Sequence, residues 1–492
     1  MTGKDTETAM PHQHHTHEHE PDRPGMDRTR SRWRWWTVGL AGATGLALTG
    51  AGVASTTAAD TVGRTVTTTL LSADLPGKSI RDRPSADDHR DDDHGNHDKG
   101  NHDKGNHDKG DKDNGKGDKG EGKKKRKGIP VPCDADRLIA AITLANTHGG
   151  AVLDLAKDCT YLLTAAQNGN GLPTITTPIT MNGKHTTIKR AAAADQFRIL
   201  TVDTGGELTL NHLKITGGHT ADSGGGILIN AGGSLTTNHS IITRNIAASG
   251  GGIATNGTTH VKHSTVSHNT ASSGGGISSS GGLLTVGTSR IAANTASFGG
   301  GITSGVAVRV DHSVIIANQA QSAGGGLLVG GGTGTITNTH ITNNAAPVGG
   351  GVLGFAGGQY TFRTVIVADN AATTGIGGGL SVDVGLSVVV EDSAIKNNTA
   401  VTDGGGIVNS GELVVRHTKI VGNQADQGGG IDNVNGATLT LLATKITKNI
   451  AVTDGGGIFN EAGGTVNLNT ATGTIVIENR PNNCVNVPGC FG

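Results

Sequence analysis

A glycine triplet that recurs in phase constrains this chain more than any other feature. In phase, Gly-Gly-Gly begins ten times at intervals of 24 to 28 residues, and Ile, Leu or Val follows each of these ten triplets. The triplets start at residues 224, 250, 274, 299, 324, 349, 377, 404, 428 and 455. A repeat of constant phase indicates stacked copies of one small unit, each of which buries its apolar face against its neighbours.

An asparagine precedes each triplet from the second onward by five to seven residues. In all nine cases Ala stands two residues after this Asn, and Ile or Val stands three residues before it. The nine residues are Asn245, Asn269, Asn294, Asn318, Asn344, Asn370, Asn398, Asn423 and Asn449. We expect them to be structural, with each amide hydrogen-bonded to the same amide on the neighbouring coils.

The residues between these fixed positions predict short strands, for example Leu284-Thr285-Val286. The period is too short for a propeller blade and lacks the leucine pattern of horseshoe repeats. We therefore predict an all-β fold, a right-handed parallel β-helix of about 12 coils with three strands per coil. Aromatic residues make up only 2% of the chain, which fits a narrow interior of Ile, Val and Leu.

The segment before the repeats predicts a cap. Residues 134–146 form an amphipathic pattern that Asp134 can cap, with Leu138, Ile139, Ile142 and Leu144 on one face. Strand-like segments follow at residues 151–155, 161–163, 174–181, 186–189 and 199–202. We assign residues 129–215 to this N-terminal cap and the first irregular coils, 216–480 to the repeats, and 481–492 to a C-terminal cap.

Four cysteines flank the predicted coils, and they allow three pairings. In an exported protein the local pairs Cys133–Cys159 and Cys484–Cys490 are the simplest choice, since each closes one end of the domain.

The chain before the cap predicts export. Residues 1–36 are polar and basic, and residues 37–59 are uncharged and mostly apolar, so they form either a cleaved signal peptide or a membrane anchor. Residues 60–128 predict a disordered spacer rich in His, Asp, Lys and Gly. With 40 basic and 41 acidic residues, the chain shows no overall cationic character that would indicate a nucleic-acid partner. A membrane contact is expected only through the N-terminal segment.

The repeat units resemble those of chlamydial polymorphic outer-membrane proteins. Residues 131–492 are more similar still to exported actinobacterial right-handed parallel β-helix repeat proteins. The segments that carry this resemblance include Val131-Pro132-Cys133, Asp158-Cys159-Thr160-Tyr161, Gly171-Leu172-Pro173, Phe197-Arg198-Ile199-Leu200 and Pro481-Asn482-Asn483-Cys484. The resemblance implies the pectin-lyase-like fold and a secreted or cell-surface location, and it supplies no catalytic or cofactor-binding residue.

Candidate site residues are few. Asp403, Asp426 and Asp454 precede successive triplets, and if they stack they could bind Ca²⁺, although Asp is also an ordinary turn residue. Two further sets are noted. The first is Asp383, Glu391 and Asp392 near Arg363 and Arg416, and the second is an outward column of Thr236, Thr285, Thr335, Thr361 and Thr440. Histidines such as His239, His260, His263 and His340 are expected on surface strands.

These observations favour a non-enzymatic β-helix that presents a repetitive surface for adhesion or for contact with the cell wall, extracellular carbohydrate or protein. The alternative is a polysaccharide lyase or glycoside hydrolase, which would need converging carboxylates in a cleft. Ice or surface-water binding by the threonine column is a third hypothesis. No cofactor is expected apart from the Ca²⁺ considered above.

Overall fold

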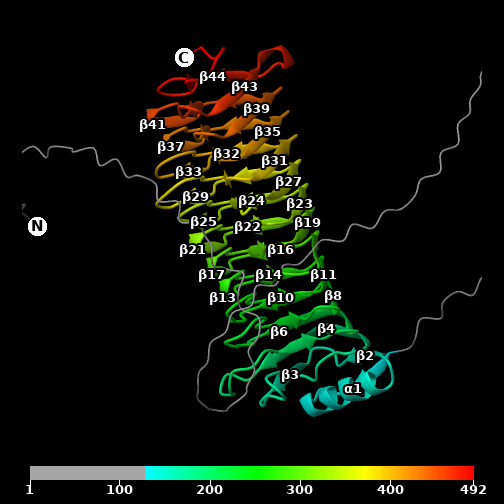
Figure 1. The fold of residues 1–492 in the computed structure, drawn as a ribbon. Helices are drawn as coiled ribbons and strands as arrows, with labels where there is room; N and C mark the ends of the chain where they lie inside the picture. The colour runs from blue at the N-terminus through cyan, green and yellow to red at the C-terminus, as the bar shows by residue number, and fades with distance from the viewer. Residues whose placement is uncertain (1–127, 492) are drawn as a thin grey trace, which may run out of the picture. The chain divides into compact units, whose positions relative to one another are not determined.

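The computed structural model describes residues 128–491, which wind into a parallel β-helix (Figure 1). Every pairing between the named strands is parallel, and each strand pairs with its counterparts one coil before and one coil after, as Ile253 does with Ile227 and Ile277. The basic region, the signal or anchor and nearly all of the spacer fall within residues 1–127, outside the described residues.

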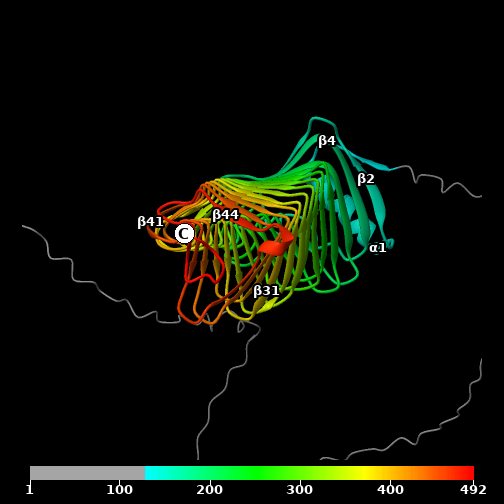
Figure 2. The same cartoon turned by 90° about the horizontal axis from the view of Figure 1, so that it is seen from above.

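Most coils of the repeat region contain four strand segments, where the sequence predicted three. A long and a short segment share one 25-stranded sheet, and the remaining two lie in an 8-stranded and a 12-stranded sheet. The reason is a bend within the first side of the coil, where one residue in the left-handed conformation, such as His239 (φ 49°), separates the long segment from the short one. Seen from above, successive coils repeat one outline (Figure 2).

The long segments are β1 (Ile129–Val131), β2 (Ala151–Leu155), β4 (Pro178–Arg190), β6 (Glu207–Thr216), β8 (Ser234–Asn238), β11 (Thr258–Lys262), β15 (Leu283–Gly287), β19 (Ala307–Asp311), β23 (Thr333–Thr337), β27 (Gly358–Arg363), β31 (Leu386–Glu391), β35 (Glu412–Arg416), β39 (Thr438–Leu442) and β43 (Thr465–Asn469). The short segments are β3 (Thr160–Leu163), β9 (Ile241–Thr243), β12 (Thr265–Ser267), β16 (Arg290–Ala292), β20 (Val314–Ile316), β24 (His340–Thr342), β28 (Ile366–Ala368), β32 (Ala394–Lys396), β36 (Lys419–Val421), β40 (Lys445–Thr447) and β44 (Ile475–Ile477).

The 8-stranded sheet contains β13 (Thr270–Ser273), β17 (Thr295–Phe298), β21 (Gln319–Ala323), β25 (Ala345–Ala346), β29 (Ala371–Ala372), β33 (Thr399–Ala400), β37 (Gln424–Gln427) and β41 (Ile450–Asp454). The 12-stranded sheet contains β5 (Leu200–Val202), β7 (Ile227–Ile229), β10 (Ile253–Thr255), β14 (Ile277–Ser279), β18 (Ile302–Ser304), β22 (Leu327–Gly330), β26 (Val352–Phe355), β30 (Leu380–Val382), β34 (Ile407–Asn409), β38 (Ile431–Asn433), β42 (Ile458–Asn460) and β45 (Cys484–Val485).

The β-helix has about 14 turns rather than the predicted 12. The additional turns precede the first triplet, where β1, β2, β4 and β6 stack in register without the glycine signature. Two of the strand-like segments predicted there, residues 174–181 and 186–189, contribute to the single long strand β4. At about 4.8 Å per rung, the stack is roughly 60 Å long.

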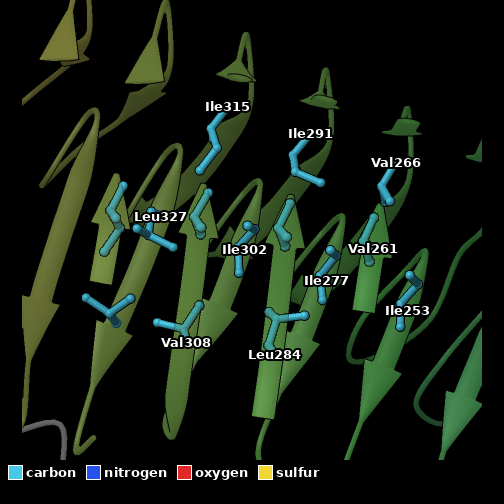
Figure 3. Packing of buried hydrophobic residues seen from close by; sticks show 14 of the residues in the cluster. Ile253, Val261, Val266, Ile277, Leu284, Ile291, Ile302, Val308, Ile315 and Leu327 are labelled. Atoms are coloured by element: carbon cyan, nitrogen blue, oxygen red, sulfur yellow. The ribbon is translucent and has the colours of Figure 1, made fainter. Parts of the chain in front are cut away.

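Aliphatic side chains fill the interior in columns that follow the register. Ile253, Ile277 and Ile302 form one column and Val266, Ile291 and Ile315 another, all fully buried (Figure 3). Burial of one such side chain contributes about 1.5–3 kcal/mol.

Tyr360 is one of four buried aromatic residues among the described residues, and the preceding coil makes room for its ring. Tyr360 is 2% exposed and pairs in register with Gly334, and a Cβ at Gly334 would overlap the tyrosine ring. Glycine at this position therefore compensates for the bulk of its neighbour on the next coil.

The glycine triplet forms a corner in which each glycine has its own steric reason. At Gly324 the backbone is left-handed (φ 68°), and a Cβ would lie 2.8 Å from that of Leu328. At Gly325 a Cβ would lie 2.6 Å from a backbone oxygen, and at Gly326 it would lie 2.9 Å from Cγ of Asn344. A side chain at any of the three positions would clash with neighbouring atoms, which explains why the glycine triplet recurs.

The N-terminal end is covered by the helix α1 (Ala135–Thr147), which Asp134 caps through a hydrogen bond from the Arg137 amide (2.9 Å). Leu138 and Ile142 are buried as predicted, but Leu144 is 52% exposed and Ala145 takes its place against the coils. Among the described residues no helix has the length and apolarity to cross a membrane.

The predicted disulfides Cys133–Cys159 and Cys484–Cys490 are both present, one at each end of the stack. Residues after β43 form a short 3₁₀ helix (Thr470–Thr472) and then β44 and β45.

Candidate functional site

The repeated asparagines form a continuous ladder along one corner of the coils. Asn344 illustrates a rung: its Oδ1 accepts hydrogen bonds from the backbone amide (2.9 Å) and Nδ2 (3.0 Å) of Asn318. Its Nδ2 donates to Oδ1 of Asn370 (3.0 Å) and to the carbonyl of Ile315 (3.0 Å). Both lone pairs of Oδ1 and both protons of Nδ2 are therefore used. These hydrogen bonds compensate for removing the almost fully buried Asn344 amide from water.

The asparagine ladder extends beyond the nine predicted residues. At its C-terminal end Asn449 donates to Asn479 (3.0 Å), which in turn donates to Asn483 (3.2 Å). At its N-terminal end Gly218 occupies the asparagine position, since its amide donates to Oδ1 of Asn245 (2.9 Å).

A second ladder, which the sequence analysis missed, is built from hydroxyl groups. Ser264 Oγ accepts from the Ser240 amide (3.1 Å), and Ser289 Oγ accepts from the Ser264 amide (3.0 Å). The residues in this position are Ser240, Ser264, Ser289, Ser313, Thr339, Val365, Ser393, Thr418, Thr444 and Thr474, all buried. The signal was in the sequence, because Ser or Thr stands five residues before the ladder asparagine in every coil except that of Val365.

The histidines occupy corners more often than strands. Seven of them have left-handed backbones, namely His185, His212, His239, His263, His268, His312 and His417. The prediction of a surface strand is therefore wrong for His239 and His263 and correct for His260 and His340, which lie in β11 and β24. His tolerates this conformation better than most residues, and each of these corners precedes a ladder residue or its equivalent.

A shallow groove follows the histidine corner at the N-terminal coils. Its lining includes Lys184, His185, His212, Lys214 and His239. Neighbouring imidazoles stack: the ring centroids of His212 and His239 are 4.9 Å apart, as are those of His239 and His263. A second depression on the same side shares Lys214 and is also lined by Lys189 and Arg244.

The aspartates considered for Ca²⁺ do not form a stacked column. Asp403 pairs in register with Gln427, which pairs with Asp454, so that Asp426 is displaced by one residue. The displacement arises because Asp426 stands two residues before its triplet, whereas the other two stand directly before theirs. Within residues 128–491, no three His, Cys, Asp or Glu side chains are grouped so that they could hold a metal ion.

A buried carboxyl group, that of Asp432, was not among the predicted site residues. It lies on β38 and is 3% exposed. Burial raises the pKa of Asp432 to about 8, and the charges of Asp403 and Glu461 add to this shift. Burial also raises the pKa of Asp403, together with the charges of Glu461 and Asp426. In the sequence, Asp432 is distinguished as a carboxylate two residues after a triplet, where other coils carry apolar or hydroxyl side chains.

The basic and acidic residues near Glu391 form an ion triad across three strands. Arg363, Glu391 and Arg416 share one register column, and each arginine donates to the buried Glu391 carboxylate. Burial opposes ionisation of Glu391, but the two arginines outweigh it, so that its pKa lies below the ordinary value. Asp383 accepts a hydrogen bond from the amide of Val384 (2.8 Å), and Oδ1 of Asp392 lies 3.7 Å from Nδ1 of His417.

The five predicted threonines share one register column, but other residues stand between them. Between Thr236 and Thr440 the same position also carries His260, Arg309, Val389 and Val414. A continuous flat array of hydroxyl groups is therefore not formed.

Comparison with known proteins identifies the repeat architecture. Residues 281–450 match a family model described as a right handed beta helix region. No curated protein and no solved structure matches the chain. The match supports the parallel β-helix and its hand, and it names no ligand or reaction.

Proposed function

We propose that this protein is an exported, non-enzymatic β-helix that presents a repetitive surface to carbohydrate, in the cell wall or outside the cell. The observation that carries the proposal is the regularity of the coils. The asparagine and hydroxyl ladders bond successive coils into one stack, so that outward side chains recur at fixed register over the whole length of the repeats.

Two further features support this proposal. Two grooves among the described residues lie at corners of neighbouring coils, and strand and corner residues line them rather than long loops. The disulfides at both ends favour an oxidising compartment, which agrees with export through residues 37–59.

The test is binding of the purified chain to an array of neutral and acidic glycans and to isolated cell walls. We expect retention on at least one carbohydrate, with the polymer recovered at its original length. Absence of retention on every glycan and wall preparation would refute the carbohydrate proposal, and shortened polymer would refute the non-enzymatic one.

A polysaccharide hydrolase is the second candidate, and the pair Asp403 and Asp432 favours it. Two carboxyl groups with raised pKa values in one neighbourhood can supply a general acid at neutral pH. A screen of acidic and neutral polysaccharides with and without Ca²⁺ tests this role. Activity that disappears in Asp432→Asn and in Asp403→Asn, but persists in Asp369→Asn at an exposed corner, would establish it.

A further inference from the structure

The short strand segments of the N-terminal coils, together with the corners that flank them, concentrate positive charge. We call the residues Lys184, His185, Lys189, Lys214, Arg244 and Arg290 together with the stacked imidazoles of His212, His239 and His263 the cationic strip. Lys214 and Arg290 share one register column three coils apart, with Ile241 and Thr265 on the coils between them. Successive rungs are about 4.8 Å apart.

The side chains of the strip are largely available to a ligand. Lys184, Lys189, Arg244, Arg290 and the three stacked histidines are exposed, and Lys214 is half-buried between the two depressions that it lines. Because the histidine backbones are left-handed corners, their rings project from the edge of the stack and follow its axis.

Few carboxylates oppose this charge. At the N-terminal end of the strip, Asp158 pairs with Lys157 (3.3 Å) and His185 (3.1 Å), and the exposed Asp195 follows β4. At the other end, Asp311 is bound to Thr337 (2.5 Å) and His312 (2.7 Å). Four further acids belong to these coils. Asp154 on β2 accepts a hydrogen bond from Asn182 (2.8 Å), two residues before Lys184. Asp203 and Glu207 stand before and at the start of β6, and Asp222 pairs with Arg198 (3.8 Å).

The imidazoles lie among cations. His212 and His239 share their groove with Lys184 and Lys214, and Lys262 precedes His263 in the chain. Thr288 is the next corner residue after His263, and it separates the stack from the pair Asp311–His312. Imidazole and ammonium groups therefore line the same groove, where one anionic ligand could contact both.

We propose that the cationic strip binds an acidic polysaccharide through direct ion pairs with its carboxylate or sulfate groups, and that binding strengthens as the imidazoles gain protons. The inference rests on the proposed carbohydrate contact and assigns its ligand class and location. A linear polymer that carries repeated anions can contact cations spread over several successive coils. Nucleic acid fits less well, because single strands stack on aromatic platforms and the strip contains no Phe, Tyr or Trp.

The experiment measures binding of the full chain to immobilised polygalacturonate, chondroitin sulfate, dextran and double-stranded DNA at pH 5 and pH 8. We expect binding to the two acidic polysaccharides alone, about tenfold tighter at pH 5, because imidazole ordinarily titrates near pH 6.5. The two polymers distinguish carboxylate from sulfate recognition. Binding should persist with EDTA and weaken with added salt.

Matched variants locate the site. Lys214→Gln and Arg244→Gln should each weaken binding about two- to fivefold. Lys445→Gln, in the same register column at the far end of the stack, should leave it unchanged. The triple change His212→Asn, His239→Asn and His263→Asn should remove the pH dependence while keeping the fold, since Asn338 already occupies an equivalent left-handed corner.

Equal binding to dextran and the acidic polymers, or unchanged binding in Lys214→Gln and Arg244→Gln, would overturn the strip as the site while leaving a carbohydrate function intact. Preferential binding to DNA would overturn the ligand class. Failure to bind any of the glycans of the wider array would instead remove the proposed function itself.

Discussion

The replacement Asn344→Ala tests how far the asparagine ladder stabilises the coils. The side chain of Asn344 makes four hydrogen bonds, two with Asn318 and one each with Asn370 and the Ile315 carbonyl. Alanine removes all four. It leaves two buried donors on Asn318 without a partner, namely the backbone amide and one proton of Nδ2.

A buried polar group that loses its partner costs about 1–3 kcal/mol. Two orphaned donors at Asn318 therefore predict a loss of about 3 kcal/mol, with the lower part of the range applying if water enters the space of the amide. Since repeat proteins gain stability from nearest-neighbour contacts, the loss should be concentrated in the coils that contain Asn318, Asn344 and Asn370.

Hydrogen exchange followed by mass spectrometry measures this locally, because a stacked array need not unfold in one step. We expect exchange in these three coils to accelerate about a hundredfold, with the coil of Asn245 unchanged. The control is Asn343→Gly, at the adjacent exposed corner (φ 55°), where glycine keeps the backbone conformation and no ladder bond is lost. Equal exchange in both variants, or uniform acceleration along the whole stack, would refute the reasoning.

Three further predictions concern single positions. Val365→Thr restores the missing hydroxyl in the second ladder and should raise the free energy of unfolding by about 0.5–1.5 kcal/mol in denaturant titration, whereas a loss of stability would contradict the ladder's role there. Gly334→Ala should destabilise by about 1–3 kcal/mol because the new methyl group overlaps Tyr360, and Tyr360→Val should be better tolerated in that background than alone, as a double-mutant cycle would reveal. Asp432 keeps its proton in the folded state up to about pH 8, while the unfolded chain releases it near pH 4. The free energy of unfolding should therefore fall as the pH rises from about 4 to about 8, by up to about 1.4 kcal/mol per pH unit. Asp432→Asn should flatten this dependence and Asp369→Asn should not; identical pH profiles for wild type and Asp432→Asn would contradict the assignment.

The sequence alone determined the period, the stacking asparagines and the capping helix. It favoured the local disulfide pairs among three possible pairings, and the structure contains these pairs. These features are legible because a β-helix places equivalent residues one coil apart, so that a local rule repeats at constant spacing. The number of early coils was underestimated, since β1, β2, β4 and β6 satisfy the same register without the glycine triplet.

Only the tertiary structure decided which residues from different coils meet. A shift of a single residue before a triplet separated Asp426 from Asp403 and Asp454, and a partner on the next coil explained Gly334. The stacking of the histidines also required the structure, because it depends on left-handed corners on adjacent coils. Asp432 is a distinctive carboxylate in the sequence, but its raised pKa depends on burial beside charges from neighbouring coils. Periodicity determines which position of the coil a residue occupies, whereas contact between coils depends on exact register, and that is fixed only when the chain is wound.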